Sequence, residues 1–513
     1  MTTAARLMIQ GTSSSAGKSV LVTGLCRLYA RRGLRVAPFK AQNMALNSFV
    51  THEGGEIGRS QAVQAEACGI LPTVAMNPVL LKPNSDHRSQ VIVNGRVATT
   101  LNAKEYYVWR RTLVSTVRDA FESLANAHDL VIIEGAGSPA EINLRENDLV
   151  NMGMAGMAES PVVLVGDIER GGVFASLYGT AALLEPEDRA RIRGFVVNRF
   201  RGDVSILDPG LRQLEDLTHI PVLGVLPHWD IRIEEEDSLA ERLGRARSTR
   251  GGDLDIAVVK LPRMANFTDF GIFDLLPGVA LRYVLPGEPL GEPDMVIIPG
   301  SKSTIADMAT LHETGTSAMI REYHAQGGVV AGICGGYQML GVSIADPDRS
   351  ESNMKGIQGL GLLDVQTEFG TRKRTVRTAG EVLPVTGFFS GAKGMPVEGY
   401  EIHMGWTSLL SGARPLLRLT DGSPEGAVSS DGLVFGTYMH GLFDSFPIAC
   451  ALVDELRQRR GQHFPIWTPP FATYREYRLA QYDRLADILE EHLDMRALDA
   501  MIGLSARKGD KRC

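Results

Sequence analysis

The stretch RLMIQGTSSSAGKSV, residues 6–20, decides the fold of the first half of the chain. An apolar run ends at Gly11, small residues follow, and a helix-like stretch begins near Lys18. Small residues let backbone N–H groups converge on phosphate oxygens, and a helix N-terminus adds about half a positive charge. The stretch therefore predicts a strand, a phosphate-binding loop and a helix.

In such a loop the lysine reaches the outer phosphates and the hydroxyl that follows it ligates Mg²⁺. The spacing departs from the usual pattern, because five residues separate Gly11 from Gly17 and position 12 is Thr. A purely structural glycine turn is the alternative. The ATP-binding residues predicted from the loop are Gly11, Thr12, Gly17, Lys18 and Ser19.

Short apolar runs alternate with helical stretches through the first half of the chain. Such runs are typical of a parallel sheet that is covered on both faces. The further strands predicted here are residues 34–40, 129–137, 161–167, 192–200 and 221–227.

Acidic residues stand at the ends of two of these predicted strands, namely Glu134 and Asp167. The carboxyl ends of parallel strands meet at the crevice where such sheets bind ligands, and carboxylates there can hold Mg²⁺. A helix cap or a turn carboxylate is the alternative for each. Together with the loop, they predict a metal site made of Ser19, Glu134 and Asp167.

The segment 231–253 is charged and ends in Gly-Gly, which is typical of a domain boundary. Beyond it the α/β alternation restarts at 254–262, 294–304, 327–336 and 432–443. We predict two α/β domains, each a mostly parallel sheet flanked by helices, with a helical C-terminal tail that includes 474–495. The divisions expected are 1–235, a linker at 236–252, a second domain at 253–450 and an extension at 451–513.

A cysteine stands between an apolar run and two glycines in VVAGICGGYQMLG, residues 329–341. A sharp turn there would expose Cys334 at a helix N-terminus, which favours the nucleophilic thiolate. His440, at the end of a late strand, is the candidate base, and the N–H groups of Gly300 and Gly335 are candidate oxyanion donors. A buried cysteine that packs as a small hydrophobe is the alternative.

The composition excludes several classes of protein. The net charge of −7 gives no general nucleic-acid footprint, and the five scattered cysteines argue against a zinc site or a disulfide framework. No apolar run approaches the ~18–20 residues that cross a bilayer, and the N-terminal apolar run is too short for a signal peptide. We expect a cytoplasmic protein without membrane insertion.

Two motifs carry a resemblance to known families. GICGGYQMLG (332–341) resembles the nucleophile region of class I glutamine amidotransferases, and GTSSSAGKS (11–19) resembles the phosphate loop of dethiobiotin synthetase. A chain with the ATP-dependent half first and the glutaminase half second resembles the cobyrinate amidase family. Other stretches that carry the resemblance are 39–48, 77–83, 85–95, 134–144, 166–176, 262–270, 399–405 and 438–443.

The resemblance implies ATP- and glutamine-dependent amidation of the b, d, e and g carboxylates of adenosylcobyrinic acid a,c-diamide in cobalamin biosynthesis. It implies ATP, Mg²⁺ and small-molecule substrates, no bound prosthetic group, acyl phosphate intermediates, and ammonia made by Cys334 and His440. It implies that Lys40 contacts phosphate or the acceptor carboxylate and that Asn198 contacts adenine. A solvated lysine and a turn asparagine are the alternatives, and self-association is left open.

The sequence departs from the wider amidotransferase pattern, in which a Glu stands two residues after the His. Here that residue is Leu442. We expect a backbone carbonyl or water to orient His440. Asp444 is the alternative, although it is most simply the N-cap of a helix starting near Phe446.

Three other functions are open at this point. They are cobyrinic acid a,c-diamide synthase or another P-loop amidoligase, a partition-type or carrier ATPase, and an inactive glutaminase half that serves as a binding module. The ATPase hypothesis gives Cys334 and His440 no role.

Overall fold

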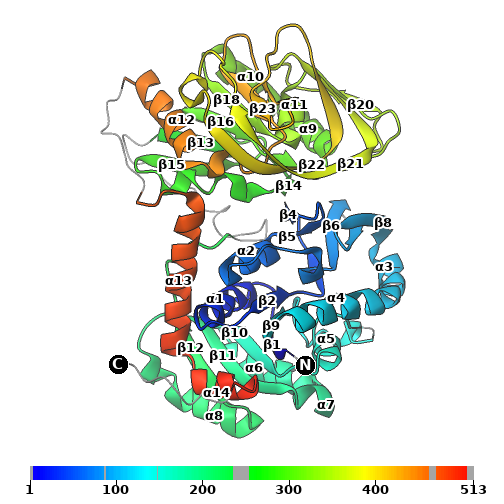
Figure 1. The fold of residues 1–513 in the computed structure, drawn as a ribbon, viewed down its shortest axis with the longest axis vertical. Helices are drawn as coiled ribbons and strands as arrows, with labels where there is room; N and C mark the ends of the chain where they lie inside the picture. The colour runs from blue at the N-terminus through cyan, green and yellow to red at the C-terminus, as the bar shows by residue number, and fades with distance from the viewer. Residues whose placement is uncertain (1–3, 86–87, 147, 235–253, 462–469, 505–513) are drawn as a thin grey trace.

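The structure is a computed structural model that describes residues 4–85, 88–146, 148–234, 254–461 and 470–504. It has two α/β bodies stacked end to end, with the first half of the chain below the second in Figure 1. The predicted fold class is therefore confirmed. The predicted linker at 236–252 lies outside the described residues. None of the described helices is both long enough and apolar enough to span a membrane.

The first domain is built on a six-stranded parallel sheet in the order β12-β11-β10-β1-β9-β2. All six strands were expected from their apolar runs. Their bounds are β1 Ala5–Gly11, β2 Val36–Phe39, β9 Leu130–Glu134, β10 Val162–Asp167, β11 Ile192–Phe200 and β12 Val222–Pro227.

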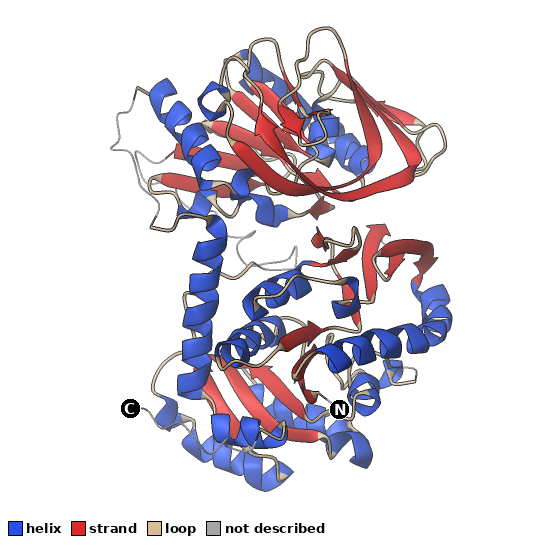
Figure 2. Ribbon diagram, in the orientation of Figure 1, coloured by secondary structure: helices blue, strands red, loops and turns tan. Residues whose placement is uncertain are grey.

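Helices cover both faces of this sheet (Figure 2). Successive side chains of a strand point to opposite faces, so Leu7 and Ile9 of β1 pack with one set of helices and Met8 packs with the other. The helices of this domain are α1 Lys18–Arg31, α2 Arg59–Cys68, α3 Ala103–Trp109, α4 Val114–Ala127, α5 Met152–Met157, α6 Val173–Leu183, α7 Pro186–Arg189 and α8 Asp208–Thr218.

A smaller sheet and a hairpin, neither of them predicted, lie beyond the carboxyl edge of the main sheet. The sheet contains β3 Gln42–Met44, β6 Val79–Ser85, β7 Arg88–Val93 and β8 Arg96–Asn102, and the hairpin pairs β4 Ser48–Val50 with β5 Glu56–Gly58. Figure 1 shows β4 between the two bodies, directly below the second domain. The segment that follows β2 therefore leads from one domain to the surface of the other.

The second domain has a sheet in the order β15-β13-β16-β18-β26-β25, in which only β25 is antiparallel. The strands are β13 Leu254–Val259, β15 Val279–Val284, β16 Met295–Ile298, β18 Val329–Ile333, β25 Ala427–Val428 and β26 Val434–Thr437. The helices are α9 Thr304–Glu313, α10 Thr316–Ala325, α11 Gly335–Leu340 and α12 Phe446–Arg459.

A second sheet in this domain was not predicted. It contains β19 Ser343–Ala345, β20 Gly356–Gln358, β21 Val365–Val382, β22 Pro396–Leu409, β23 Leu417–Leu419 and β24 Pro424–Glu425. The start of β21 alternates buried and exposed residues, because only one of its faces is covered. Such a strand has no continuous apolar run, which is the signal that identified the parallel strands.

The helical C-terminal tail returns to the first domain. Helix α13 (Tyr474–His492) runs down the side of the molecule in Figure 1 and packs on α1, and α14 (Met495–Met501) follows it. Gly24 of α1 allows this approach, since a Cβ there would lie 2.4 Å from Leu489 Cδ1. Arg27 and Asp483 form an ion pair of 2.8 Å across the two helices. The predicted boundary at 450 falls inside α12, whose apolar face belongs to the second domain's core.

Candidate active sites

Cys334 lies at a sharp turn between β18 and α11. Its backbone has φ 52° and ψ −107°, a region that residues other than glycine rarely adopt. The next turn passes so close to β16 that a Cβ on Gly336 would lie 1.9 Å from the carbonyl oxygen of Ile298. Cys334 is buried, with 7% of its surface exposed, and its thiol donates a hydrogen bond to the carbonyl oxygen of Ile402 at 3.5 Å.

His440 follows β26 and is buried beside Cys334. Its Nδ1 lies 2.7 Å from Oδ2 of Asp269, which belongs to the 3₁₀ helix Phe267–Phe270. Burial alone would lower the pKa of His440, but the charge and hydrogen bond of Asp269, together with the nearby Cys334 sulfur, raise it to about 10. A carboxylate on Nδ1 leaves Nε2 as the atom that can accept a proton.

The identity of this carboxylate corrects the expectation drawn from the sequence. A backbone carbonyl or water does not orient His440 here, and neither does Asp444, whose carboxylate lies 3.5 Å from Arg478. The N-cap expectation for Asp444 is also wrong, because Ser445 occupies that position of α12. Asp269 lies within the stretch 262–270 that carried the family resemblance, but it is 171 residues from His440, so no local spacing identifies it.

The two predicted oxyanion donors both lie next to this pair. Gly300 belongs to β17 (Gly300–Ser301), which pairs with β14 (Met264–Ala265). A Cβ on Gly300 would lie 3.4 Å from Cε1 of His440 and 3.8 Å from Cβ of Cys334. Gly335 is the first residue of α11, where backbone N–H groups have no partner within the helix.

The phosphate loop joins β1 to α1 at the carboxyl edge of the first sheet. Gly11 ends β1, the N–H of Thr12 donates to Val165 at 2.9 Å, and Gly17 precedes α1 with φ 104°. Lys18 turns back over the loop and donates to the carbonyl oxygens of Ser13 at 2.7 Å and Gly137 at 2.9 Å. Burial and the charge of Lys40 lower the pKa of Lys18 to about 8, against the opposing effect of Glu134.

Glu134 is the centre of a buried polar cluster next to this loop. Its Oε1 accepts hydrogen bonds from Ser19 Oγ and from Lys40 Nζ, each at 2.8 Å, and its Oε2 accepts one from Gln64 at 2.5 Å. Burial alone would raise the pKa of Glu134, but the Lys40 ammonium and the hydrogen bonds from Lys40, Gln64 and Ser19 together outweigh it and lower the pKa. Lys40 is 6% exposed, so the solvated lysine considered as the alternative is wrong.

Ser19 and Glu134 fit a Mg²⁺ ion, because hydroxyl and carboxylate oxygens are its preferred protein ligands. Asp167 lies across β1 from Glu134, on β10, and its oxygens accept hydrogen bonds from Arg199 at 3.1 Å and from the N–H of Glu169 at 2.9 Å. Within the described part of the chain, no group of three His, Cys, Asp or Glu side chains could hold a metal ion. Of the three predicted ligands, Ser19 and Glu134 are in direct hydrogen-bond contact.

Asn198, on β11, lies against the phosphate loop. Its Nδ2 donates to the carbonyl oxygen of Ala16 at 2.9 Å, and a Cβ on Gly17 would lie 2.0 Å from that nitrogen. Its Oδ1 is buried and has no hydrogen-bond partner among the described residues.

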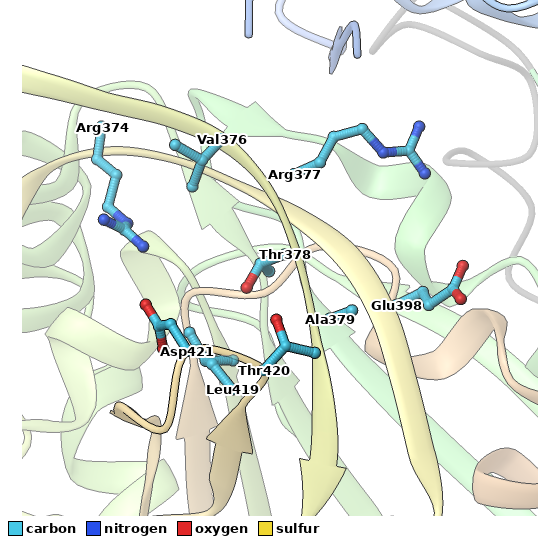
Figure 3. Close-up of a pocket in the computed structure, with 9 residues that line it drawn as sticks. All are labelled: Arg374, Val376, Arg377, Thr378, Ala379, Glu398, Leu419, Thr420 and Asp421. Atoms are coloured by element: carbon cyan, nitrogen blue, oxygen red, sulfur yellow. The ribbon is translucent and has the colours of Figure 1, made fainter.

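A cavity of about 410 Å³ opens mainly on the long strands β21 and β22, and none of the residues that line it was predicted as a site residue. Figure 3 shows its lining, with the Arg377 side chain pointing away from Arg374 and Asp421. The Arg377 guanidinium lies 5.8 Å from the centre of the Phe49 ring, in the first domain. The lining residues are Arg374, Val376, Arg377, Thr378, Ala379, Glu398, Leu419, Thr420 and Asp421.

Comparison with known proteins matches both halves of the chain. Residues 7–239 match the CobQ/CobB/MinD/ParA nucleotide binding domain, and residues 255–448 match the CobB/CobQ-like glutamine amidotransferase domain. The cobyric acid synthase of Yersinia enterocolitica is 50% identical over 95% of this chain and 96% of its own length. That of Citrobacter koseri is 49% identical over 96% and 97%, and that of Listeria monocytogenes is 47% identical over 99% and 98%. The chain belongs to the cobyric acid synthase family.

Proposed function

We propose that this chain is a glutamine-hydrolysing ligase that uses ATP to amidate the b, d, e and g carboxylates of adenosylcobyrinic acid a,c-diamide, giving adenosylcobyric acid. The observation that carries the proposal is that one chain holds two distinct sites. A buried cysteine lies beside a carboxylate-bound histidine in the second domain, and a phosphate loop lies beside Glu134 in the first.

In the second domain, Asp269 holds the Nδ1 proton of His440, so that Nε2 can take the proton of Cys334. The thiolate attacks the amide carbon of glutamine, and the N–H groups of Gly300 and Gly335 stabilise the oxyanion. His440 then returns the proton to the leaving nitrogen, ammonia departs, and water hydrolyses the thioester to glutamate.

In the first domain the acceptor carboxylate needs activation, because a carboxylate is a poor electrophile. Transfer of the γ-phosphoryl group of ATP to it gives an acyl phosphate, with Lys18 and the loop N–H groups stabilising the transferring charge. Ser19 and Glu134 would hold Mg²⁺, with Asp167 as the candidate third ligand, and the ion would neutralise phosphate charge. Lys40 is placed to meet phosphate or the acceptor carboxylate, and the unpartnered Oδ1 of Asn198 suits the amino group of adenine.

The two activities belong together for a chemical reason. Ammonia is mostly ammonium at neutral pH and is then not nucleophilic, so a tethered glutaminase supplies the neutral form next to the acyl phosphate. The proposal divides the chain into an ATP-dependent domain at 1–235, a linker at 236–252, a glutaminase domain that begins at 253 and a C-terminal extension. The boundary expected at 450 moves to the end of α12, because the apolar face of that helix lies in the core of the second domain.

The alternatives differ in what they leave without a role. A partition-type ATPase accounts for the phosphate loop but not for the arrangement of Cys334, His440 and Asp269. The cobyrinic acid a,c-diamide synthase function shares both sites and differs in its substrate. The near-full-length similarity to cobyric acid synthases supports the b, d, e and g carboxylates as acceptors.

The test uses the separation of the two sites. Cys334→Ala should abolish amidation with glutamine but retain it at high ammonium concentration, because this residue only makes ammonia. Lys18→Ala should lose amidation with either nitrogen source while Cys334 is still alkylated by a glutamine analogue. Loss of ammonium-dependent amidation in a folded Cys334→Ala protein would refute the division of labour.

A further inference from the structure

Two side chains that contact His440 also form hydrogen bonds to a residue of the first domain. Ser48, the first residue of β4, donates its N–H to Oδ1 of Asn266 at 3.0 Å and accepts a hydrogen bond on its carbonyl oxygen from the Tyr400 hydroxyl at 3.2 Å. Asn266 Nδ2 lies 3.2 Å from Nε2 of His440, and the Tyr400 ring stacks on the imidazole with centroids 5.2 Å apart. The backbone of one residue of the first domain, Ser48, is thus held on both sides by side chains that contact His440.

The contact with Ser48 fixes which way the Asn266 amide points. An N–H group needs an acceptor, so Oδ1 must face Ser48 and the NH₂ group must face His440. The backbone of Asn266 has φ 53° and ψ 42°, a left-handed conformation that asparagine tolerates better than most residues. Asn266 is buried, with 4% of its surface exposed.

This orientation has a chemical consequence for the base. When the ring of His440 is neutral, Nε2 is an acceptor, because Nδ1 bonds to Asp269, and the Asn266 amide then occupies Nε2. The thiol proton of Cys334 points instead to the carbonyl oxygen of Ile402. In the charged imidazolium, Nε2 would carry a proton and would face a second donor. Asn266 therefore opposes the proton transfer that activates Cys334.

Ser48 is connected by a short length of chain to the phosphate-loop site. Lys40, which is bonded to Glu134, lies eight residues before Ser48. Eight residues of fully extended chain span at most about 28 Å. The Ser48 hydroxyl also donates to Glu56 at 2.7 Å, whose carboxylate pairs with Lys82 at 2.7 Å. Segment 40–48 joins the Lys40–Glu134 pair to Ser48, and its strand β3 pairs with β6 between them.

We propose that Asn266 is a positioning residue that restrains glutamine hydrolysis. While Ser48 holds its carbonyl, its amide occupies Nε2 of His440; binding of ATP and acceptor near Lys40 shifts segment 40–48 and releases it. This inference rests on the proposed function and adds to it a route by which the first domain controls the second.

The test compares glutaminase rates of the full chain with and without ATP, Mg²⁺ and the corrinoid acceptor. Asn266→Ala removes the donor to Nε2, and Asn266→Asp keeps an acceptor for Ser48 but places an acceptor at Nε2. Both should raise the rate without synthetase substrates by about three- to ten-fold, the factor that one neutral hydrogen bond carries. The stimulation by those substrates should fall toward one. Arg377→Ala, which alters the same interface at an exposed side chain away from His440, should match the wild type.

The pH profile separates this role from a merely structural one. A donor at Nε2 lowers the pKa of the imidazolium, so its removal raises that pKa and moves the alkaline limb of the unstimulated glutaminase to higher pH. A loosened loop would weaken the Asp269 contact and move the limb to lower pH.

The inference would be overturned if both Asn266 variants hydrolysed glutamine at the wild-type rate or more slowly in the absence of synthetase substrates. It would also be overturned if the alkaline limb of their pH profile stayed in place or moved to lower pH. A wild-type glutaminase that ATP and acceptor fail to stimulate would overturn it as well, while leaving the proposed function intact. Absence of any Cys334-dependent glutaminase activity would refute the proposed function itself.

Discussion

Asp269→Asn should inactivate the glutaminase while leaving the synthetase in place. The substitution removes the negative charge beside Nδ1 of His440 but preserves the size of the side chain. The amide can also donate to Nδ1, which would leave the proton on Nε2 and give the base the wrong tautomer.

The size of the effect follows from the His440 environment. Burial lowers the pKa of His440, but Asp269 and Cys334 together outweigh this effect and raise the pKa from 6.5 to about 10. That rise corresponds to about 5 kcal/mol in favour of the charged ring. Asp269 contributes more of it than Cys334 does. Its loss should therefore cost on the order of 2 kcal/mol, or roughly 30-fold in rate, and up to about 10⁴-fold if the tautomer changes.

The assay is glutamate release at saturating glutamine, with amidation at high ammonium concentration measured on the same preparation. Asp444→Asn is the matched control, since Asp444 lies near Arg478 and occupies the position first considered for the orienting acid. It should keep nearly the wild-type glutaminase rate. A near-normal rate in Asp269→Asn, or an equal loss in Asp444→Asn at matched thermal stability, would refute this reasoning.

Three further predictions concern the first domain. Binding of ATP should be accompanied by proton uptake between about pH 8 and 10. In the free protein, burial and the charge of Lys40 lower the pKa of Lys18 to about 8, and the phosphates restore the charge of Lys18. Calorimetry in buffers of different ionisation enthalpy measures the uptake, and Lys18→Arg should show none. Glu134→Gln should abolish Mg²⁺-dependent amidation with ammonium as the nitrogen source. An equally severe loss in Asp167→Asn would show that Asp167 also ligates the metal ion. Leu489→Ala should lower the free energy of unfolding by about 2–5 kcal/mol in urea titrations, because Leu489 is fully buried against α1; a loss below ~1 kcal/mol would contradict the docking of α13.

Much of the architecture could be predicted from local patterns. The strands that flank the phosphate loop and Cys334 are buried on both faces, so each appears as a continuous apolar run. The glycine-rich turns after them mark the sites, because close backbone approach requires small residues there. The long strands β21 and β22 escaped prediction because one face of each is open and their apolar residues alternate with polar ones.

The orienting carboxylate could not be predicted for a different reason. Asp269 and His440 meet only because β13 and β26 belong to one sheet and their following loops converge at its carboxyl edge. A search near His440 in sequence leads to Asp444, which faces Arg478 instead. The contacts of Asn266 with Ser48 and His440 likewise depend on how the two domains pack, and no spacing along the chain encodes them.

The most direct test of the central claim is mass spectrometry of the corrinoid after incubation of the purified chain with adenosylcobyrinic acid a,c-diamide, ATP, Mg²⁺ and glutamine. The account predicts successive exchange of OH for NH₂ at four carboxylates, with the same product from Cys334→Ala when ammonium replaces glutamine. An unmodified corrinoid with both nitrogen sources, or amidation that stops at other positions, would contradict it.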